Sequence, residues 1–83
     1  MNEAPAPRTQ SLTLRVAAEV RAEVGRQQLT HRALGELLGL SQPQVTKRLN
    51  GVIPLDTAEL DKLAAVLGVP VDRFLSTPGV EAR

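Results

Sequence analysis

Side chains suited to the recognition of nucleic-acid base edges recur along residues 42–50. Gln42, Pro43, Thr46 and Lys47 stand at spacings i, i+1, i+4 and i+5, which form one stripe along an α-helix. A glutamine amide can pair with adenine, a lysine ammonium can donate to guanine, and threonine and proline can touch the thymine methyl group. The stripe holds no carboxylate that would repel phosphate. We interpret these four residues as candidate base-contacting groups.

Other residues beside this stripe are candidates for contact with phosphate. Gln44 and Arg48 flank it. The helix expected before it begins near His31 and Arg32, where backbone N–H groups and positive charge favour an anion. A chain that uses these groups presents one side to a polyanion.

Helical patterns must position these residues. Apolar residues recur at spacings of three and four, and no alternation is long enough for a sheet, so we expect an all-α fold. The expected helices cover residues 12–27, 30–38, 42–50, 57–67 and 71–75. Their expected N-caps are Ser11 or Thr13, then Thr30, Ser41 and Asp56, with Glu59 completing a capping box.

The second and third expected helices form a helix-turn-helix, because a tight turn containing Gly39 joins them. Gly35 is small at the point where these helices must cross closely. Val45 and Leu49, spaced i, i+4, should face the core and turn the stripe outward. Leu34, Leu37 and Leu38 should form the buried side of the second helix, and Val45 and Leu49 should pack against Leu34 and Leu38.

Composition excludes several classes of function. The chain has 83 residues, no cysteine and one histidine, His31, so neither disulfides nor a conventional zinc site is expected. Phe74 is its one aromatic residue, which argues against stacking platforms for single strands. No run approaches the ~20 apolar residues of a membrane span, and the N-terminus lacks the apolar core of a signal peptide. We expect a cytoplasmic protein.

The residues also predict neither catalysis nor a cofactor. The serines have no convincingly paired histidine, and the acids stand as caps or helix-surface charges. Residues 8–51 hold seven lysines and arginines against three carboxylates, whereas residues 52–83 hold three against five. A basic front half suits a polyanionic partner. We expect a disordered arm over residues 1–10, one domain over 11–75 and a flexible tail over 76–83.

Residues 28–75 resemble the lambda-repressor-like, Cro-type helix-turn-helix family (the XRE group). The resemblance rests on LTHRALGELLGLSQPQVTKRLNG, followed by TAELDKLAAVLGV and VDRFL. It implies a five-helix bundle that binds double-stranded DNA and regulates transcription, as a phage repressor or Cro-like switch does. It assigns base contacts to the four stripe residues. It assigns phosphate contacts to the start of the second helix and to the region around Asn50, and we include Ser41 in this set.

The sequence leaves other functions open. An antitoxin-like module that grips a partner protein is the main alternative, and an architectural nucleoid protein is a third. A homodimer is expected to meet through the last two helices, while binding as a monomer to an asymmetric site remains the alternative. The residues expected at such a seam are Val69, Val71, Phe74 and Leu75.

Overall fold

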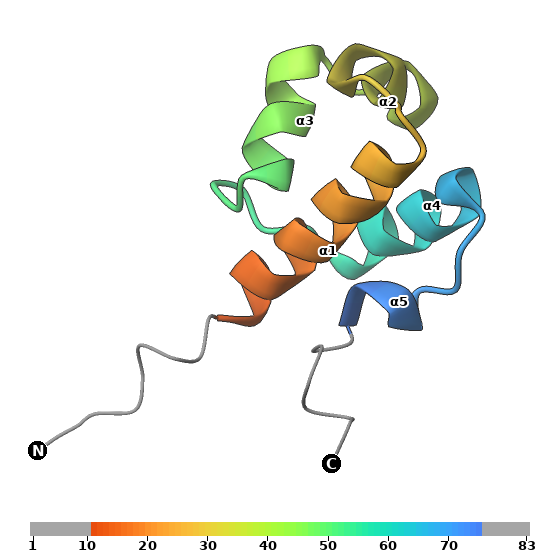
Figure 1. Cartoon of the computed structure of the whole chain (residues 1–83). Coiled ribbons are helices and arrows are strands. Elements are labelled where there is room, and N and C mark those ends of the chain that lie inside the picture. Colours follow the sequence, from red (N-terminus) through yellow and green to blue (C-terminus); the bar gives the residue numbers. More distant parts are fainter. Residues whose placement is uncertain (1–10, 76–83) are drawn as a thin grey trace, which may run out of the picture.

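Five helices make up the part of the chain that the structure, a computed structural model, describes, which is residues 11–75. The arm expected over residues 1–10 and the tail expected over 76–83 lie outside this range. The helices are α1 (Leu12–Arg26), α2 (His31–Leu38), α3 (Gln42–Leu49), α4 (Thr57–Leu67) and α5 (Asp72–Leu75) (Figure 1). No strand occurs between residues 11 and 75, so the all-α, five-helix prediction is confirmed.

The helix α1 is the central element. The pair α2 and α3 lies on one side of it and α5 on the other (Figure 1). α1 contacts α3, α4 and α5, whereas α2 packs on α3 and α4. The helix α3 is thereby held between the long helix α1 and the short helix α2.

Side-chain caps set the start of each longer helix. Ser11, rather than Thr13, accepts from the Leu14 amide at 3.2 Å, and Thr30 accepts from the Ala33 amide at 2.9 Å. Ser41 caps α3. At α4, Asp56 accepts from the Glu59 amide at 2.7 Å, and Glu59 accepts in return from the Asp56 amide at 3.2 Å. The predicted capping box is confirmed.

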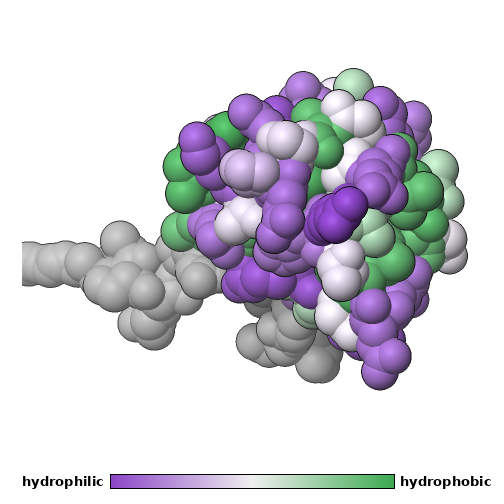
Figure 2. Space-filling view, turned by 90° about the horizontal axis from the view of Figure 1, so that it is seen from above, coloured by the Kyte–Doolittle hydropathy of each residue, from purple (hydrophilic) through white to green (hydrophobic). Residues whose placement is uncertain are grey.

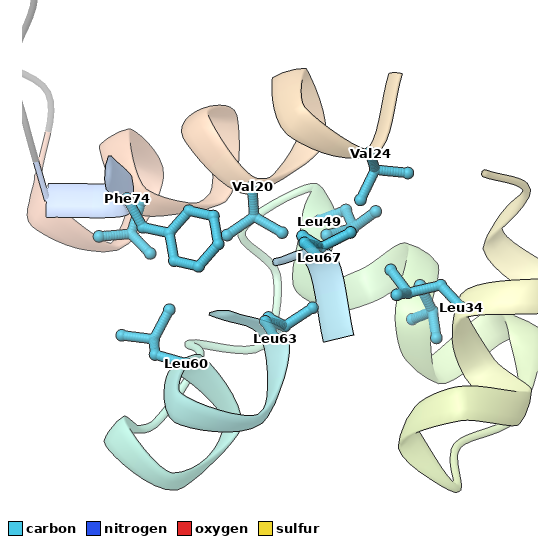
Figure 3. Close-up of a cluster of buried hydrophobic side chains, with 10 residues drawn as sticks. Val20, Val24, Leu34, Leu49, Leu60, Leu63, Leu67 and Phe74 are labelled. Atoms are coloured by element: carbon cyan, nitrogen blue, oxygen red, sulfur yellow. The ribbon is translucent and has the colours of Figure 1, made fainter. Parts of the chain in front are cut away.

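A single apolar core joins all five helices (Figure 3). Its largest member, Phe74, is 0% exposed and faces Val20 and Leu60. The sequence prediction that Phe74 belongs to a dimer seam is therefore wrong, because a side chain that fills the core of its own chain cannot reach a second one. Phe74 instead anchors the short α5 beneath α1.

The structure also corrects the predicted burial of Leu37. It was expected in the core, yet it is 55% exposed, while Leu34 is 0% exposed. Consecutive helix residues point about 100° apart. α2 meets its neighbours along the side that carries Leu34 and Leu38, which leaves Leu37 turned to solvent.

A buried carboxylate fastens the end of α1 to α5. Glu23 is 5% exposed and accepts from Arg26 at 2.7 Å, Gln27 at 2.9 Å and Arg73 at 3.1 Å. The pKa of Glu23 is held below its ordinary value mainly by the hydrogen bond from Arg26, and next by the hydrogen bond from Gln27. Gln27 also donates to the Leu67 carbonyl at 2.7 Å, so α4 joins the same network.

The turn between α2 and α3 depends on two glycines. Gly39 ends α2 in the left-handed region, with φ of 76°. A Cβ at Gly35 would collide with the Leu40 carbonyl oxygen, and the Leu40 amide donates to the Gly35 carbonyl at 2.8 Å. This close approach is what brings α3 down onto α2.

We expect Gly35→Ala to lower the free energy of unfolding by about 1–3 kcal/mol, because the obstructing atom is backbone and cannot swing aside. Gly25→Ala is the matched control, since a Cβ at Gly25 meets nothing within 4 Å. It should be neutral or stabilising by up to about 1 kcal/mol. Urea denaturation of both variants measures the difference, and equal stabilities would contradict the role assigned to Gly35.

Candidate nucleic-acid interface

The rotation of α3 about its own axis places the predicted stripe outward. Val45 and Leu49 are each 1% exposed and pack in the core. Pro43 and Lys47 lie on the other side of the helix and are exposed, and Gln42, its first residue, is exposed at the start of the helix. Pro43 stands in the first turn, where its missing N–H leaves no carbonyl unpaired. Three of the four candidate base-contacting residues are therefore free to meet a partner.

Thr46, the fourth residue of the stripe, is half-buried and already has a partner. Its Oγ1 lies 2.9 Å from Nδ1 of His31, the first residue of α2. The sequence placed His31 with the phosphate-contacting residues and did not predict this bond. Fifteen positions separate the two residues in the chain. Only the crossing of α2 and α3 brings them together.

Arg48 is turned away from the stripe toward α4. Its Nε donates to Glu59 at 2.9 Å, and its side chain is 14% exposed. Its Nη1 donates to the Gln44 carbonyl at 3.0 Å and to the Gln44 side chain at 2.9 Å. Both Arg48 and Gln44 were predicted to contact phosphate. The structure gives each of them a partner inside the chain.

The C-terminus of α3 is held by a residue that sequence reasoning missed. Nη1 of Arg21, on α1, donates to the carbonyl oxygen of Leu49. A cation suits the C-terminal end of a helix, where carbonyl groups lack partners within the helix. The sequence offers no signal for this pairing, because the two residues lie 28 positions apart.

The remaining candidates lie at helix ends beside α3. Ser41 accepts from the Gln44 amide at 3.4 Å as the N-cap, and Asn50 is the exposed C-cap residue. The Arg32 side chain is 81% exposed, with a long 3.8 Å ion pair to Glu36. Arg32 thus keeps its charge available at the start of α2.

The end of the molecule that carries α2 and α3 is largely polar. Seen from that end, hydrophilic side chains cover most of the centre of the surface (Figure 2). Among residues 11–75, no three His, Cys, Asp or Glu side chains gather to hold a metal ion. None of the helices in that range has the length and apolarity needed to cross a membrane.

Comparisons with known proteins agree with this geometry. A helix-turn-helix family model matches residues 18–74, more than half of the chain. The chain therefore belongs to the helix-turn-helix family, of the XRE type, and is a DNA-binding transcriptional regulator.

A solved structure shares the fold. The crystal structure of the clp gene regulator ClgR from C. glutamicum is similar with a TM-score of 0.76, over 81% of this chain and 87% of that chain. The two sequences are 21% identical, so this likeness shows the fold alone. Among curated proteins, no sequence matches.

We expect the ion pair between Arg48 and Glu59 to stabilise the packing of α3 on α4. A double-mutant cycle with Arg48→Met and Glu59→Gln should give a coupling energy of about 1 kcal/mol. Glutamine suits this test because it can keep the capping box. Denaturant unfolding of the four proteins measures the coupling.

The pair formed by Arg32 and Glu36 is the matched control. Its side chains are 81% and 73% exposed and 3.8 Å apart, so its coupling should be close to zero. If the two cycles give the same coupling, the ion pair does not hold α3.

Proposed function

We propose that this protein binds double-stranded DNA sequence-specifically and reads the major groove with α3. The observation that supports this most directly is the division of α3 into two sides. Val45 and Leu49 are buried, and Gln42 and Lys47 are exposed. A rigid helix with a polar, carboxylate-free outer side is what groove reading requires.

The dimensions of α3 fit the groove. An α-helix with its side chains is roughly 10–12 Å in diameter, and the major groove is about 12 Å wide. Gln42 would pair with adenine, Lys47 would donate to guanine, and Pro43 would touch a thymine methyl group. Thr46 would reach the groove from its half-buried place beside His31.

Phosphate contacts would come from the helix ends beside α3. The N-terminus of α2 offers unpaired N–H groups together with His31 and Arg32, and Ser41 and Asn50 stand at the two ends of α3. We leave Arg48 and Gln44 out of this set, because their polar groups already bond within the chain. Arg48 serves to hold α3 in place.

A repressor of the phage or Cro type is the finer expectation, and it rests on the sequence resemblance. Sites bound in genomic DNA test it, because a repressor of this kind should occupy sites that overlap promoters. Sites placed only upstream of promoters would favour an activator.

A second copy of the chain is the occupant we propose for an apolar groove on the side of α4 and α5. The groove holds about 450 Å³ and is lined mainly by leucines and valines, among them Leu12, Leu55, Leu60, Val71 and Leu75. Leu12 is 54% exposed and Leu75 46%. A surface with both a hollow and projecting leucines can meet a copy of itself about a two-fold axis. Such a dimer would read half-sites ~34 Å apart.

Leu75→Lys should convert the dimer into a monomer, because a buried, unpaired ammonium is costly at an apolar interface. Leu37→Lys is the control, since Leu37 is 55% exposed and lies outside the groove. Sedimentation equilibrium of the parent and both variants measures the state. A monomeric parent rules the dimer out, and an equal effect of Leu37→Lys rules out the groove as its interface.

Lys47→Ala and Gln42→Ala should each weaken specific binding by about 1–3 kcal/mol and relax the preference at one base pair. Lys62→Ala, an exposed lysine on α4, should leave both unchanged. Selection of bound sequences from random duplex DNA at two salt concentrations gives the motif, and titration gives the affinities. If both α3 variants bind specific and random DNA as the parent does, Lys47 and Gln42 do not contact the bases.

A further inference from the structure

The contact between His31 and Thr46 joins a residue beside the DNA backbone to a residue in the reading stripe. His31 begins α2, the helix end where a phosphate is expected, and Thr46 lies in the middle of α3. Nδ1 and Oγ1 are 2.9 Å apart, which is hydrogen-bond distance. Two sites that contact DNA in different ways therefore share one hydrogen bond.

The direction of this bond decides what Thr46 can offer to a base. A hydroxyl has one hydrogen to donate and two lone pairs that accept, and a neutral imidazole has one donor nitrogen and one acceptor nitrogen. When Nδ1 accepts the Thr46 hydrogen, Oγ1 keeps only lone pairs for DNA. When Nδ1 donates, the Thr46 hydrogen is free to reach a base acceptor.

Phosphate fixes the choice. A phosphate oxygen can only accept, so if Nε2 contacts a phosphate at the start of α2, that nitrogen carries the hydrogen. Nδ1 of the neutral ring is then the acceptor. The Thr46 hydroxyl donates inward, and its lone pairs face the groove.

We propose that His31 is a specificity-positioning residue that makes Thr46 an acceptor in the groove. This inference rests on the proposed function and names one of its determinants. Thr46 then selects a base with an amino group at the position it faces, either adenine through N6 or cytosine through N4. Backbone contact and base selection are coupled through a single imidazole.

Two substitutions of His31 separate its two nitrogens. An asparagine amide places its polar atoms about as far from the backbone as Nδ1, whereas a glutamine amide places them about as far as Nε2. His31→Asn therefore keeps an acceptor for Thr46, and His31→Gln loses it. Thr46→Val removes the hydroxyl and keeps the shape of the side chain. Circular dichroism checks that each variant is folded.

The probe is the selected duplex with one functional group changed at the base pair whose selection Thr46→Val relaxes. One duplex has hydrogen in place of the exocyclic amino group, and another has C–H in place of the purine N7. At about pH 8, above the ordinary histidine range, loss of the amino group should weaken binding by the parent about three- to tenfold. Loss of N7 should leave binding by the parent unchanged.

The variants should then divide into two groups. His31→Asn should keep the amino-group effect, although its affinity for all DNA falls. In His31→Gln and in Thr46→Val, removal of the amino group should leave binding almost unchanged. The variant that carries both substitutions should behave in the same way. A His31 that only contacts phosphate would lower affinity for every duplex without changing this ratio.

Several results overturn the inference. One is an amino-group effect that survives in His31→Gln, and another is an effect lost equally in His31→Asn. If loss of N7, rather than loss of the amino group, weakens binding by the parent, then Nδ1 of His31 donates to Thr46 and not the reverse. A parent that selects no sequence at all overturns the proposed function, and this inference with it.

Discussion

The burial of Val45 and Leu49 is the constraint on which the rest of this molecule depends. Burying each side chain contributes about 1.5–3 kcal/mol. Helix positions advance about 100° per residue, so fixing these two residues inward points Lys47 about 200° away from Val45. Rotating α3 by one residue would expose both apolar side chains and bring Lys47 toward the core. A few kcal/mol of apolar burial thus set which side of α3 meets solvent.

Burial alone does not fix α3 along its length, because eight residues make too short a helix to be stable in isolation. Polar contacts from three other helices complete the attachment. Arg21 on α1 holds the last carbonyl, His31 on α2 contacts the middle, and Glu59 on α4 holds Arg48. The residues proposed to read DNA therefore project from a helix whose position is set by the chain's own contacts.

Local signals in the sequence predicted most of the fold. Caps, glycine turns and the apolar spacing of α3 act within a few residues, so they can be read from neighbours in the chain. The exposure of Leu37 could not be read this way, because it depends on which side of α2 meets other helices. The partners of Arg21 and His31 were missed for the same reason, since each lies more than ten positions away.

The basic residues of α3 show why counting charge along a sequence overstates the charge that a helix presents to solvent. Lys47 and Arg48 are neighbours, yet one is exposed and the other is 14% exposed against Glu59. The ion pair neutralises one charge of each sign. It removes the repulsion that an unpaired Glu59 beside α3 would exert on phosphate, and it leaves Lys47 as the exposed cation of α3 itself. Recognition then depends less on total charge than on which single cation the packing of α3 leaves free.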